Sequence, residues 1–270
     1  MRQIRLNSGL RPLAPLGRAQ TRVRSLAWRA RGGEAPGGPG FRILSYHRIS
    51  DERDDLAVAL RQFRRQLDAL AGEGYRGVDV LTVLDAAPGA VGLAFVGGSR
   101  DIAEHALPEL ERHGFTATVF LATAVTEGRV PQAWSRARPP LLSWEEVSAL
   151  DGGVLRFESL SVTHPNLPAV DDACAREEVV ASKRDLEAHL GREVSVFCYP
   201  AGLFGEREAR LVSAAGFRAA CTAEPGLNRG STDPFRLHRI RIDARDSLLD
   251  FRAKLDGGFD VPSRLRRRRS

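Results

Sequence analysis

The stretch VGLAFVGGSRDIAEHALPELERHGFTATVFLA (residues 91–122) decides the fold class. It begins with the apolar run VGLAFV (91–96), which has the length of a buried strand. Residues 101–112 have the pattern of a helix, and Gly114 follows where a helix commonly ends. The second apolar run, TATVFLA (116–122), has the composition of another strand. A strand, a helix and a strand in this order predict a parallel β-α-β unit.

The same alternation continues on both sides of this unit. Further strands are expected at 41–46, 154–159, 194–199, 217–222 and 237–242, and helices at about 60–70, 172–190, 206–215 and 246–254. Ser143 and Glu146 have the spacing of a capping box that opens a short helix. The pattern predicts an α/β protein with a mainly parallel sheet, and an open sheet and a closed barrel both fit it. Functional residues are then expected in the loops after Tyr46, Val96, Ser159 and Tyr199, at the carboxyl ends of strands.

Charge and composition divide the chain into three parts. Residues 1–40 form a basic N-terminal extension that ends in the linker-like segment 32–40, and residues 259–270 form a basic C-terminal tail. Residues 1–40 carry a net +7 and residues 264–270 carry +5, so the total of +6 leaves −6 for residues 41–263. We therefore expect one folded domain over 41–258 that does not bind nucleic acid. The arginine-rich tails could contact anionic surfaces.

Several other classes of protein are not indicated. Cys174, Cys198 and Cys221 are scattered, which predicts reduced thiols and no disulfide framework or zinc site. No apolar run has the length of a transmembrane helix, and the N-terminus has no continuous apolar core of a secretory signal. A cytoplasmic location is the resulting expectation.

Five segments, in order, resemble the polysaccharide deacetylases with a NodB homology domain, which are carbohydrate esterase family 4. They are ILSYHRIS (43–50), FRRQLDALAGEGY (63–75), SRDIAEHALPELERHGFTATVFL (99–121), SVTHPNL (161–167) and FCYPAGLFGE (197–206). The resemblance covers about residues 41–245. It implies a distorted (β/α) barrel of about seven strands, consistent with the alternation above.

The resemblance also implies a metal-assisted amide hydrolysis. In that family a strand ends in Thr-Phe-Asp-Asp-Gly, where the first aspartate is the general base and the second binds a divalent metal, usually zinc. A later Ser-His-x-x-x-His segment supplies two histidine ligands. The metal activates water and polarises the acetyl carbonyl, while the separate carboxylate accepts a proton.

In this chain three of these positions carry other residues. Val96 stands at the position of the base and Gly97 at that of the metal-binding aspartate. Leu160 replaces the first histidine ligand, so that only His164 remains. Valine and leucine have no lone pair and glycine has no side chain. We therefore predict no bound cofactor and no deacetylase activity.

Other polar residues near these loops are candidates for the pocket lining or for a rebuilt site. Glu158 precedes Leu160 by two residues, so both side chains should point to the same side of a strand. Asp101 should lie in the first turn of the helix after Gly97, where it also complements the helix dipole. His47 follows a strand and should face the pocket. Tyr199 and Pro200 are expected at the groove wall. His238 is a weaker candidate for a late general acid, and a strand-end histidine is the preferred interpretation.

Three hypotheses follow. The first is a deacetylase-like protein without catalysis, a pseudoenzyme whose candidate partners are a glycan in the remaining groove and another protein. The second is a metal-dependent N- or O-deacetylase of a glycan whose site is rebuilt from Glu158, His164 and either His47 or Asp101. The third is an adaptor that binds nucleic acid or membrane through its arginine tails. The first is preferred because the losses are concentrated at the chemical positions.

Overall fold

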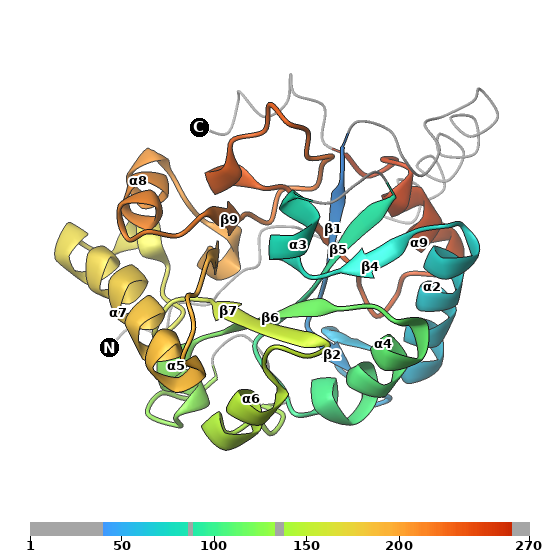
Figure 1. The fold of residues 1–270 in the computed structure, drawn as a ribbon, viewed down its shortest axis with the longest axis horizontal. Coiled ribbons are helices and arrows are strands. Elements are labelled where there is room, and N and C mark those ends of the chain that lie inside the picture. Colours follow the sequence, from blue (N-terminus) through green and yellow to red (C-terminus); the bar gives the residue numbers. More distant parts are fainter. Residues whose placement is uncertain (1–39, 86–88, 133–137, 261–270) are drawn as a thin grey trace.

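A parallel sheet curled into a distorted barrel forms the centre of the molecule. The structure is a computed structural model that describes residues 40–85, 89–132 and 138–260. Its main sheet has eight strands, and every pair in it is parallel. Helices surround the sheet on its outer side (Figure 1). The barrel predicted from the sequence is thus confirmed, and the open sheet is not what forms.

The strands follow one another around the barrel in the order β10-β1-β5-β6-β7-β8-β9, with β4 beside the first half of β5. Their bounds are β1 (Arg42–Tyr46), β4 (Arg76–Val78), β5 (Ala90–Val96), β6 (Ala117–Leu121), β7 (Leu155–Ser159), β8 (Val196–Cys198), β9 (Ala219–Cys221) and β10 (Ile240–Arg241). Leu237 bridges to Cys221 on β9 shortly before β10 pairs with β1. The segment 237–241 therefore joins the two ends of the sheet.

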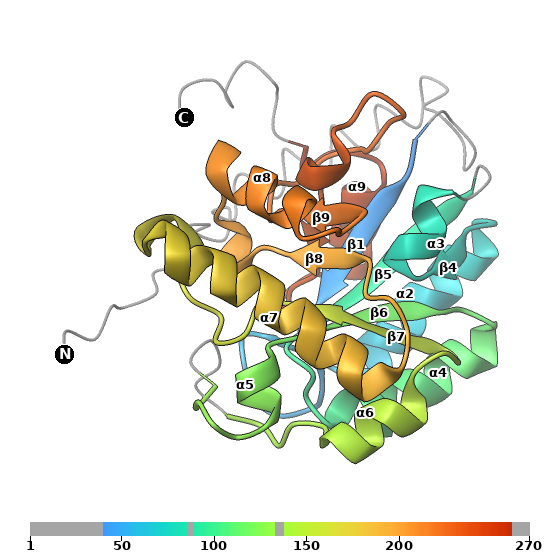
Figure 2. The same cartoon turned by 60° about the vertical axis from the view of Figure 1, so that its left-hand side comes forward.

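The helices cover the outer face and one end of the barrel. They are α2 (Leu60–Gly72), α3 (Val80–Leu84), α4 (Leu107–His113), α5 (Thr123–Thr126), α6 (Trp144–Leu150), α7 (Asp172–Leu190), α8 (Glu206–Ala214) and α9 (Leu248–Leu255), with 3-10 turns η2 (Leu167–Ala169), η3 (Pro200–Gly202) and η4 (Pro234–Arg236). Figure 2 shows the long helix α7 beside α8 on the side of β7 and β8. In the part of the chain that the structure describes, no helix is long and apolar enough to cross a membrane.

Local sequence signals explain most of these boundaries. Ser143 and Glu146 form the predicted capping box at the start of α6. Gly114 ends α4 in the left-handed conformation, with φ of 64°. The helix expected over 101–112 is divided, because one π-helical turn, η1 (Ile102–Ala106), precedes α4. Pro108 has no N–H to donate to the carbonyl four residues back, which accounts for the irregular turn.

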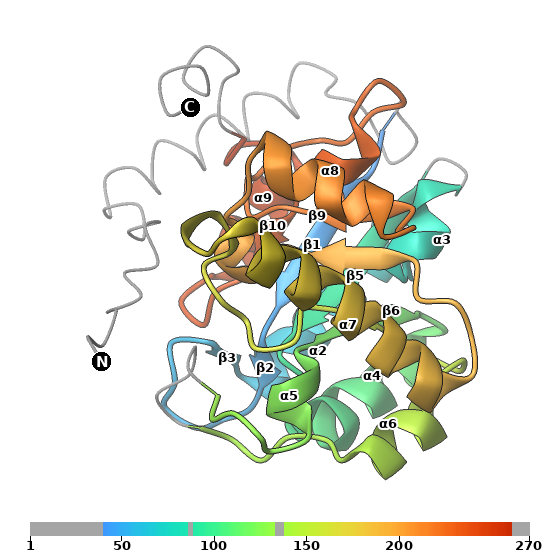
Figure 3. The same ribbon diagram turned by 90° about the vertical axis from the view of Figure 1, so that its left-hand side faces the viewer.

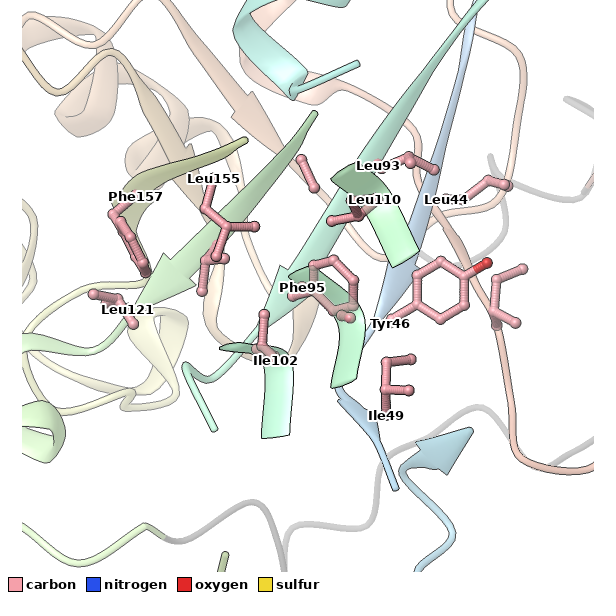
Figure 4. Close-up of a cluster of buried hydrophobic side chains, with 14 of the residues drawn as sticks. Leu44, Tyr46, Ile49, Leu93, Phe95, Ile102, Leu110, Leu121, Leu155 and Phe157 are labelled. Carbon is pink, nitrogen blue, oxygen red and sulfur yellow. The ribbon is translucent and has the colours of Figure 1, made fainter. Parts of the chain in front are cut away.

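Two apolar clusters pack on the two faces of the sheet. The outer cluster lies between strands and helices, where Tyr46 contacts Phe63 and Phe95 at ring-centroid distances of 5.2 and 5.6 Å. Figure 4 shows this layer of side chains on β1, β5, β6 and β7. The inner cluster fills the barrel, and Val80 and Val83 of α3 belong to it. Because these strands are buried on both faces, their sequences are continuously apolar.

A small second sheet marks the end of the barrel where the strands finish. It consists of β2 (Arg48–Ile49) and β3 (Ala57–Val58), which are parallel. Because β2 follows β1 directly and α5 follows β6 directly, both lie beyond the carboxyl ends of the strands. Figure 3 shows β2, β3 and α5 on the same side of the molecule. This is the end at which the predicted functional residues are expected.

The folded body extends slightly past the boundary expected at residue 258. The carboxylate of Asp260 accepts two hydrogen bonds from the Arg42 guanidinium, at 2.8 and 3.0 Å. The first strand and the last described residue are therefore held together.

Candidate ligand pocket at the carboxyl ends of the strands

A small pocket lies where β1 and β5 end. His47, Val96, Gly97, Ser99 and Gln132 line it, together with Arg48 and Leu56. Its volume is about 10 Å³, which is roughly the space that one buried water molecule needs. The structure thus brings together His47, Val96 at the end of β5, and Gly97, which follows it.

The residues at the replaced positions are part of the apolar interior. Val96 is 5% exposed and Leu160 is fully buried, and both belong to the inner cluster. Neither can accept a proton or bind a metal. Gly97 has φ of 112°, a conformation that an aspartate side chain would strain. The backbone at the end of β5 therefore suits glycine at position 97, and the packing around position 96 suits a buried apolar side chain.

His47 is neutral in the folded protein. Burial lowers its pKa to about 3, and the positive charges of Arg239 and Arg241 add to this effect. Its Nδ1 atom is buried and has no hydrogen-bond partner among the described residues. His47 therefore presents an uncharged imidazole to the pocket.

His164 lies within electrostatic reach of His47, because it lowers the pKa of His47. The positive charge of Arg239 lowers the pKa of both histidines. Burial lowers the pKa of His164 itself to about 4. The residue has φ of 59°, and its backbone N–H donates to Ser161 Oγ at 3.1 Å. The turn after β7 thus places His164, the remaining histidine of the family motif, where its charge can act on His47.

Asp101 is held in an ion pair, so its carboxylate is not free to bind a metal. Arg48 Nε donates to its Oδ2 at 2.7 Å, and Ser99 Oγ donates to its Oδ1 at 2.6 Å. Arg48 also binds Asp54 and Glu52, at 3.1 and 2.8 Å. Both oxygens of Asp101 therefore accept hydrogen bonds, and the ion pair fixes β2 against η1. The residue is the N-cap of η1, so it stands at the helix start as expected, but its side chain does not cap the helix.

Glu158 is the main correction to the candidate site. Its side chain is fully buried and accepts hydrogen bonds from the backbone N–H groups of Ser195 and Val196, at 2.8 and 2.7 Å. It also pairs with Arg156 and Arg192, at 2.8 and 3.3 Å. Burial raises the pKa of Glu158, and these donors oppose that effect. The carboxylate is turned to the start of β8, so it does not join His164 at the end of β7.

The interpretation of Tyr199 as a pocket residue is also wrong. Its ring belongs to the outer cluster and stacks on Phe204 at a centroid distance of 4.7 Å. Its hydroxyl donates to the carbonyl oxygen of Phe235 at 3.0 Å. Pro200 is buried at the start of the turn η3. This loop therefore anchors the sheet to the helices and the turn η4.

His238 has a structural environment, in agreement with the preferred interpretation. Its backbone N–H donates to Asn228 Oδ1 at 2.8 Å, and its Nδ1 lies 3.9 Å from Glu224 Oε2. The ring packs so closely on Gly226 that a Cβ there would come within 2.8 Å of it. These contacts place His238 at a strand end rather than in the pocket with His47.

Arg239 is a buried arginine whose charge lowers the pKa values of His47 and His164, and the sequence prediction did not include it. It is 7% exposed, and its Nε donates to the carbonyl oxygen of Thr222 while Nη1 donates to Ser45 Oγ at 3.0 Å. In LHRIRI (237–242), period-two alternation places Arg239 on the same face as Leu237, which is in the inner cluster. The alternation therefore indicates an inward side chain for Arg239 and the opposite face for His238.

The donor set does not fit the divalent metal that the family resemblance implies. Among the described residues, no three His, Cys, Asp or Glu side chains are grouped so that they could hold a metal ion. Cys198 and Cys221 are buried and free, and Cys174 is exposed and free. His47 and His164 alone provide fewer ligands than a protein zinc site uses.

Comparisons with known proteins agree with this architecture. The sequence model of the family described as polysaccharide deacetylase matches residues 84–220. The protein named putative polysaccharide deacetylase YxkH from Bacillus subtilis is 24% identical over 207 residues, which are 74% of this chain and 70% of that protein.

Two solved structures have the same fold. The deacetylase PplD of Streptococcus pyogenes superposes with a TM-score of 0.70 at 22% identity, covering 82% of this chain and 99% of that one. IcaB from Ammonifex degensii superposes with a TM-score of 0.67 at 21% identity, covering 84% and 100%. At these identities the structural likeness concerns the fold alone.

Proposed function

This chain belongs to the polysaccharide deacetylase family, and from that premise we propose that it is a member without deacetylase activity. It keeps the scaffold and retains binding of a glycan or a protein partner. The observation that carries the proposal is the environment of Val96 and Leu160, which are packed in the apolar interior at positions where the family chemistry needs a carboxylate and an imidazole.

The expected loss of rate is too large for minor adjustments to restore. Removal of a general base alone costs about 10²–10⁴-fold in rate. Even a change in a group that supports a metal ligand costs about 10–100-fold in affinity or activity. In this chain two of the three metal ligands are absent as well as the base, so these losses combine.

The alternative hypothesis of a rebuilt metal site finds no support in the geometry. It required Glu158 and His164 as ligands together with either His47 or Asp101. Glu158 is bound by two backbone N–H groups and two arginines. Asp101 is bound by Arg48 and Ser99. To reach a metal, either carboxylate would have to leave a buried, charged network.

Metal content and acetate release test the proposal directly. The chain is loaded with zinc, cobalt or nickel, and assayed with N-acetylated oligosaccharides. The same is done for the triple variant Val96→Asp, Gly97→Asp, Leu160→His. We expect much less than one equivalent of metal and no acetate release for the original chain. Metal-dependent release of acetate by the original chain would sink the proposal.

The triple variant is expected to gain metal binding, although aspartate at position 97 must overcome the strain of the positive φ. A matched control adds His164→Ala to the three changes and should remove the gained metal. Calorimetric titration of the original chain with acetylated oligosaccharides tests the binding role. If no heat of binding is measured at millimolar oligosaccharide, glycan binding is excluded and a protein remains as the proposed partner.

A further inference from the structure

Two cysteines lie next to each other on the inner face of the barrel. Cys198 ends β8 and Cys221 ends β9, and the two residues are direct partners in the parallel pairing of these strands (Figure 2). Both side chains belong to the inner apolar cluster, so they point to the same side of the sheet. Each cysteine is fully buried and free. The pairing of β8 with β9 therefore brings together two thiols that are scattered in the sequence.

Arg239 supplies a positive charge beside this pair of thiols. Its guanidinium donates to the carbonyl oxygen of Thr222, the residue that follows Cys221, and to Ser45 Oγ at 3.0 Å. Both of these acceptors are uncharged. Burial raises the pKa of both thiols, and the charge of Arg239 opposes that effect. A buried cation beside two thiols favours their anionic form, which is the form that binds metals.

The spacing of the strands favours a bridging ion over a direct bond between the two sulfur atoms. Neighbouring strands lie about 4.7–4.9 Å apart. A disulfide needs Cβ atoms about 3.5–4.5 Å apart, so it would draw the strands together. An ion held in line between two thiolates spans about 4.6 Å, if each metal–sulfur bond has the length of about 2.3 Å found for zinc thiolates. Such a bridge fits between β8 and β9 without moving either strand.

The ligand set indicates a soft monovalent ion. Structural zinc sites use four protein ligands, whereas no three candidate ligands are grouped anywhere in the described part of the chain. Thiolates select copper(I), and they do not suit magnesium or calcium. Copper(I) and two thiolates together carry one negative charge, which the single positive charge of Arg239 balances.

We propose that Cys198 and Cys221 form a two-coordinate site for copper(I) inside the barrel. The ion forms one bond to each sulfur, and the two thiol protons are released to solvent. No electron is transferred, because copper enters as copper(I). The ion then joins β8 to β9 through their side chains. This site goes beyond the proposed function, because it uses none of the positions that the family chemistry needs.

The test measures copper(I) binding to the full chain, kept free of oxygen in a reductant that contains no thiol. A coloured copper(I) chelator competes for the ion, and X-ray absorption counts the sulfur neighbours of the bound metal. Because both thiols are buried, one sample is also refolded in the presence of copper(I), so that slow entry is not mistaken for lack of binding. We expect one equivalent of copper(I) with two sulfur neighbours.

Serine variants of the three cysteines separate this site from other thiols. Cys198→Ser and Cys221→Ser each lose one of two ligands, so each should bind copper(I) at least ~100-fold more weakly than the original chain. Cys174→Ser, on the exposed surface of α7, is the matched control and should bind as the original chain does. If a variant at 198 or 221 does not fold, the sulfur count of Cys174→Ser decides, because its thiols are then Cys198 and Cys221 alone.

Three results would overturn the inference. They are fewer than two sulfur neighbours in Cys174→Ser, equal copper(I) affinity of the original chain and a folded Cys198→Ser, and a disulfide between Cys198 and Cys221 formed by oxidised glutathione in the folded chain. The disulfide would show that the sulfur atoms lie too close for a linear bridge. Failure here leaves the proposed function intact, because that is judged by zinc, cobalt or nickel content and acetate release. Conversely, a chain that releases acetate would disprove the proposed function whether or not it binds copper(I).

Discussion

Glu158 shows what a single residue contributes when its carboxylate is buried in the barrel wall. It accepts hydrogen bonds from the backbone of Val196, the first residue of β8, and of Ser195 just before it. It also pairs with arginines on β7 and on the loop before β8. It thus joins two strands through charge and hydrogen bonds rather than through apolar contact. This is a structural role, where the sequence had suggested a ligand.

Glu158→Gln should therefore destabilise the fold. We expect a loss of about 2–4 kcal/mol in the free energy of unfolding, because two partly buried arginines and two backbone N–H groups lose a charged acceptor. Urea denaturation measures it. Glu111→Gln, at an exposed position on α4, is the control and should stay within about 0.5 kcal/mol of the original. A neutral result at 158 would mean that the ion pairs contribute little.

His47 should make stability depend on pH. Its folded pKa of about 3 lies below the unfolded value of 6.5. Below pH 6.5 the unfolded chain binds a proton that the folded chain does not, so stability falls as pH falls from 6.5 toward 3. Between pH 7 and 5 this residue should account for about 1–2 kcal/mol.

Denaturation of His47→Gln at both pH values measures that share. The variant should lose less stability than the original chain between pH 7 and pH 5, while His105→Gln, on the outer helix layer, should behave like the original. Equal pH dependence in His47→Gln and the original chain would show that His47 is accessible to protons in the folded state.

At the scale of elements, the sequence predicts seven of the eight strands of the main sheet and misses the short strand β4. It also does not predict how far along the barrel axis each side chain lies. Buried parallel strands are continuously apolar, so β1, β5 and β6 were recognisable. Alternation correctly placed Glu158 on the inner face with Leu160. Glu158 lies about 6.6 Å before Leu160 along the strand, and there it meets the start of β8. Alternation could not show this contact, because the contact depends on the pairing of β7 with β8.

Tyr199 illustrates the same limit at the junction of a strand and a turn. Its predicted place in the groove assumed that the loop after β8 faces inward, and the turn η3 keeps the ring in the outer layer instead. The replaced positions Val96, Gly97 and Leu160 could be assigned from sequence because they depend only on the family pattern. For Arg239, alternation indicates the inward face, but its burial could not be predicted, since that depends on closure of the barrel by the segment 237–241.

Tyr199→Phe tests the outer position of this ring. The variant loses one partly buried hydrogen bond to the carbonyl of Phe235, so we expect about 0.5–1.5 kcal/mol less stability by urea denaturation. The NMR signals of the His47 ring should not move, because the hydroxyl lies on the other side of the sheet. A change in those signals would indicate that the Tyr199 hydroxyl does act on the pocket.

For the whole molecule, the separation of charge predicts that the body and the tails act independently. A chain reduced to residues 40–260 keeps the pair between Arg42 and Asp260. Its melting temperature should equal that of the full chain, while salt-dependent binding to nucleic acid or to anionic vesicles should be lost. Binding that persists in the reduced chain would place the anionic surface contact on the body.

A chain ending at residue 258 is the matched comparison for this reduced chain. It removes Asp260 and leaves the Arg42 guanidinium without its partner, so it should melt at a lower temperature than 40–260. Equal melting temperatures would show that the pair is only a surface contact.

The contact between the first strand and the end of the body has a consequence for biosynthesis. β1 emerges first from the ribosome, but its partner β10 and the carboxylate of Asp260 are made about two hundred residues later. At about 5–20 residues per second, one edge of β1 stays uncovered for roughly ten to forty seconds. An unpaired apolar strand is a site for aggregation during that time, so the nascent chain is expected to depend on chaperones until its last strand is released.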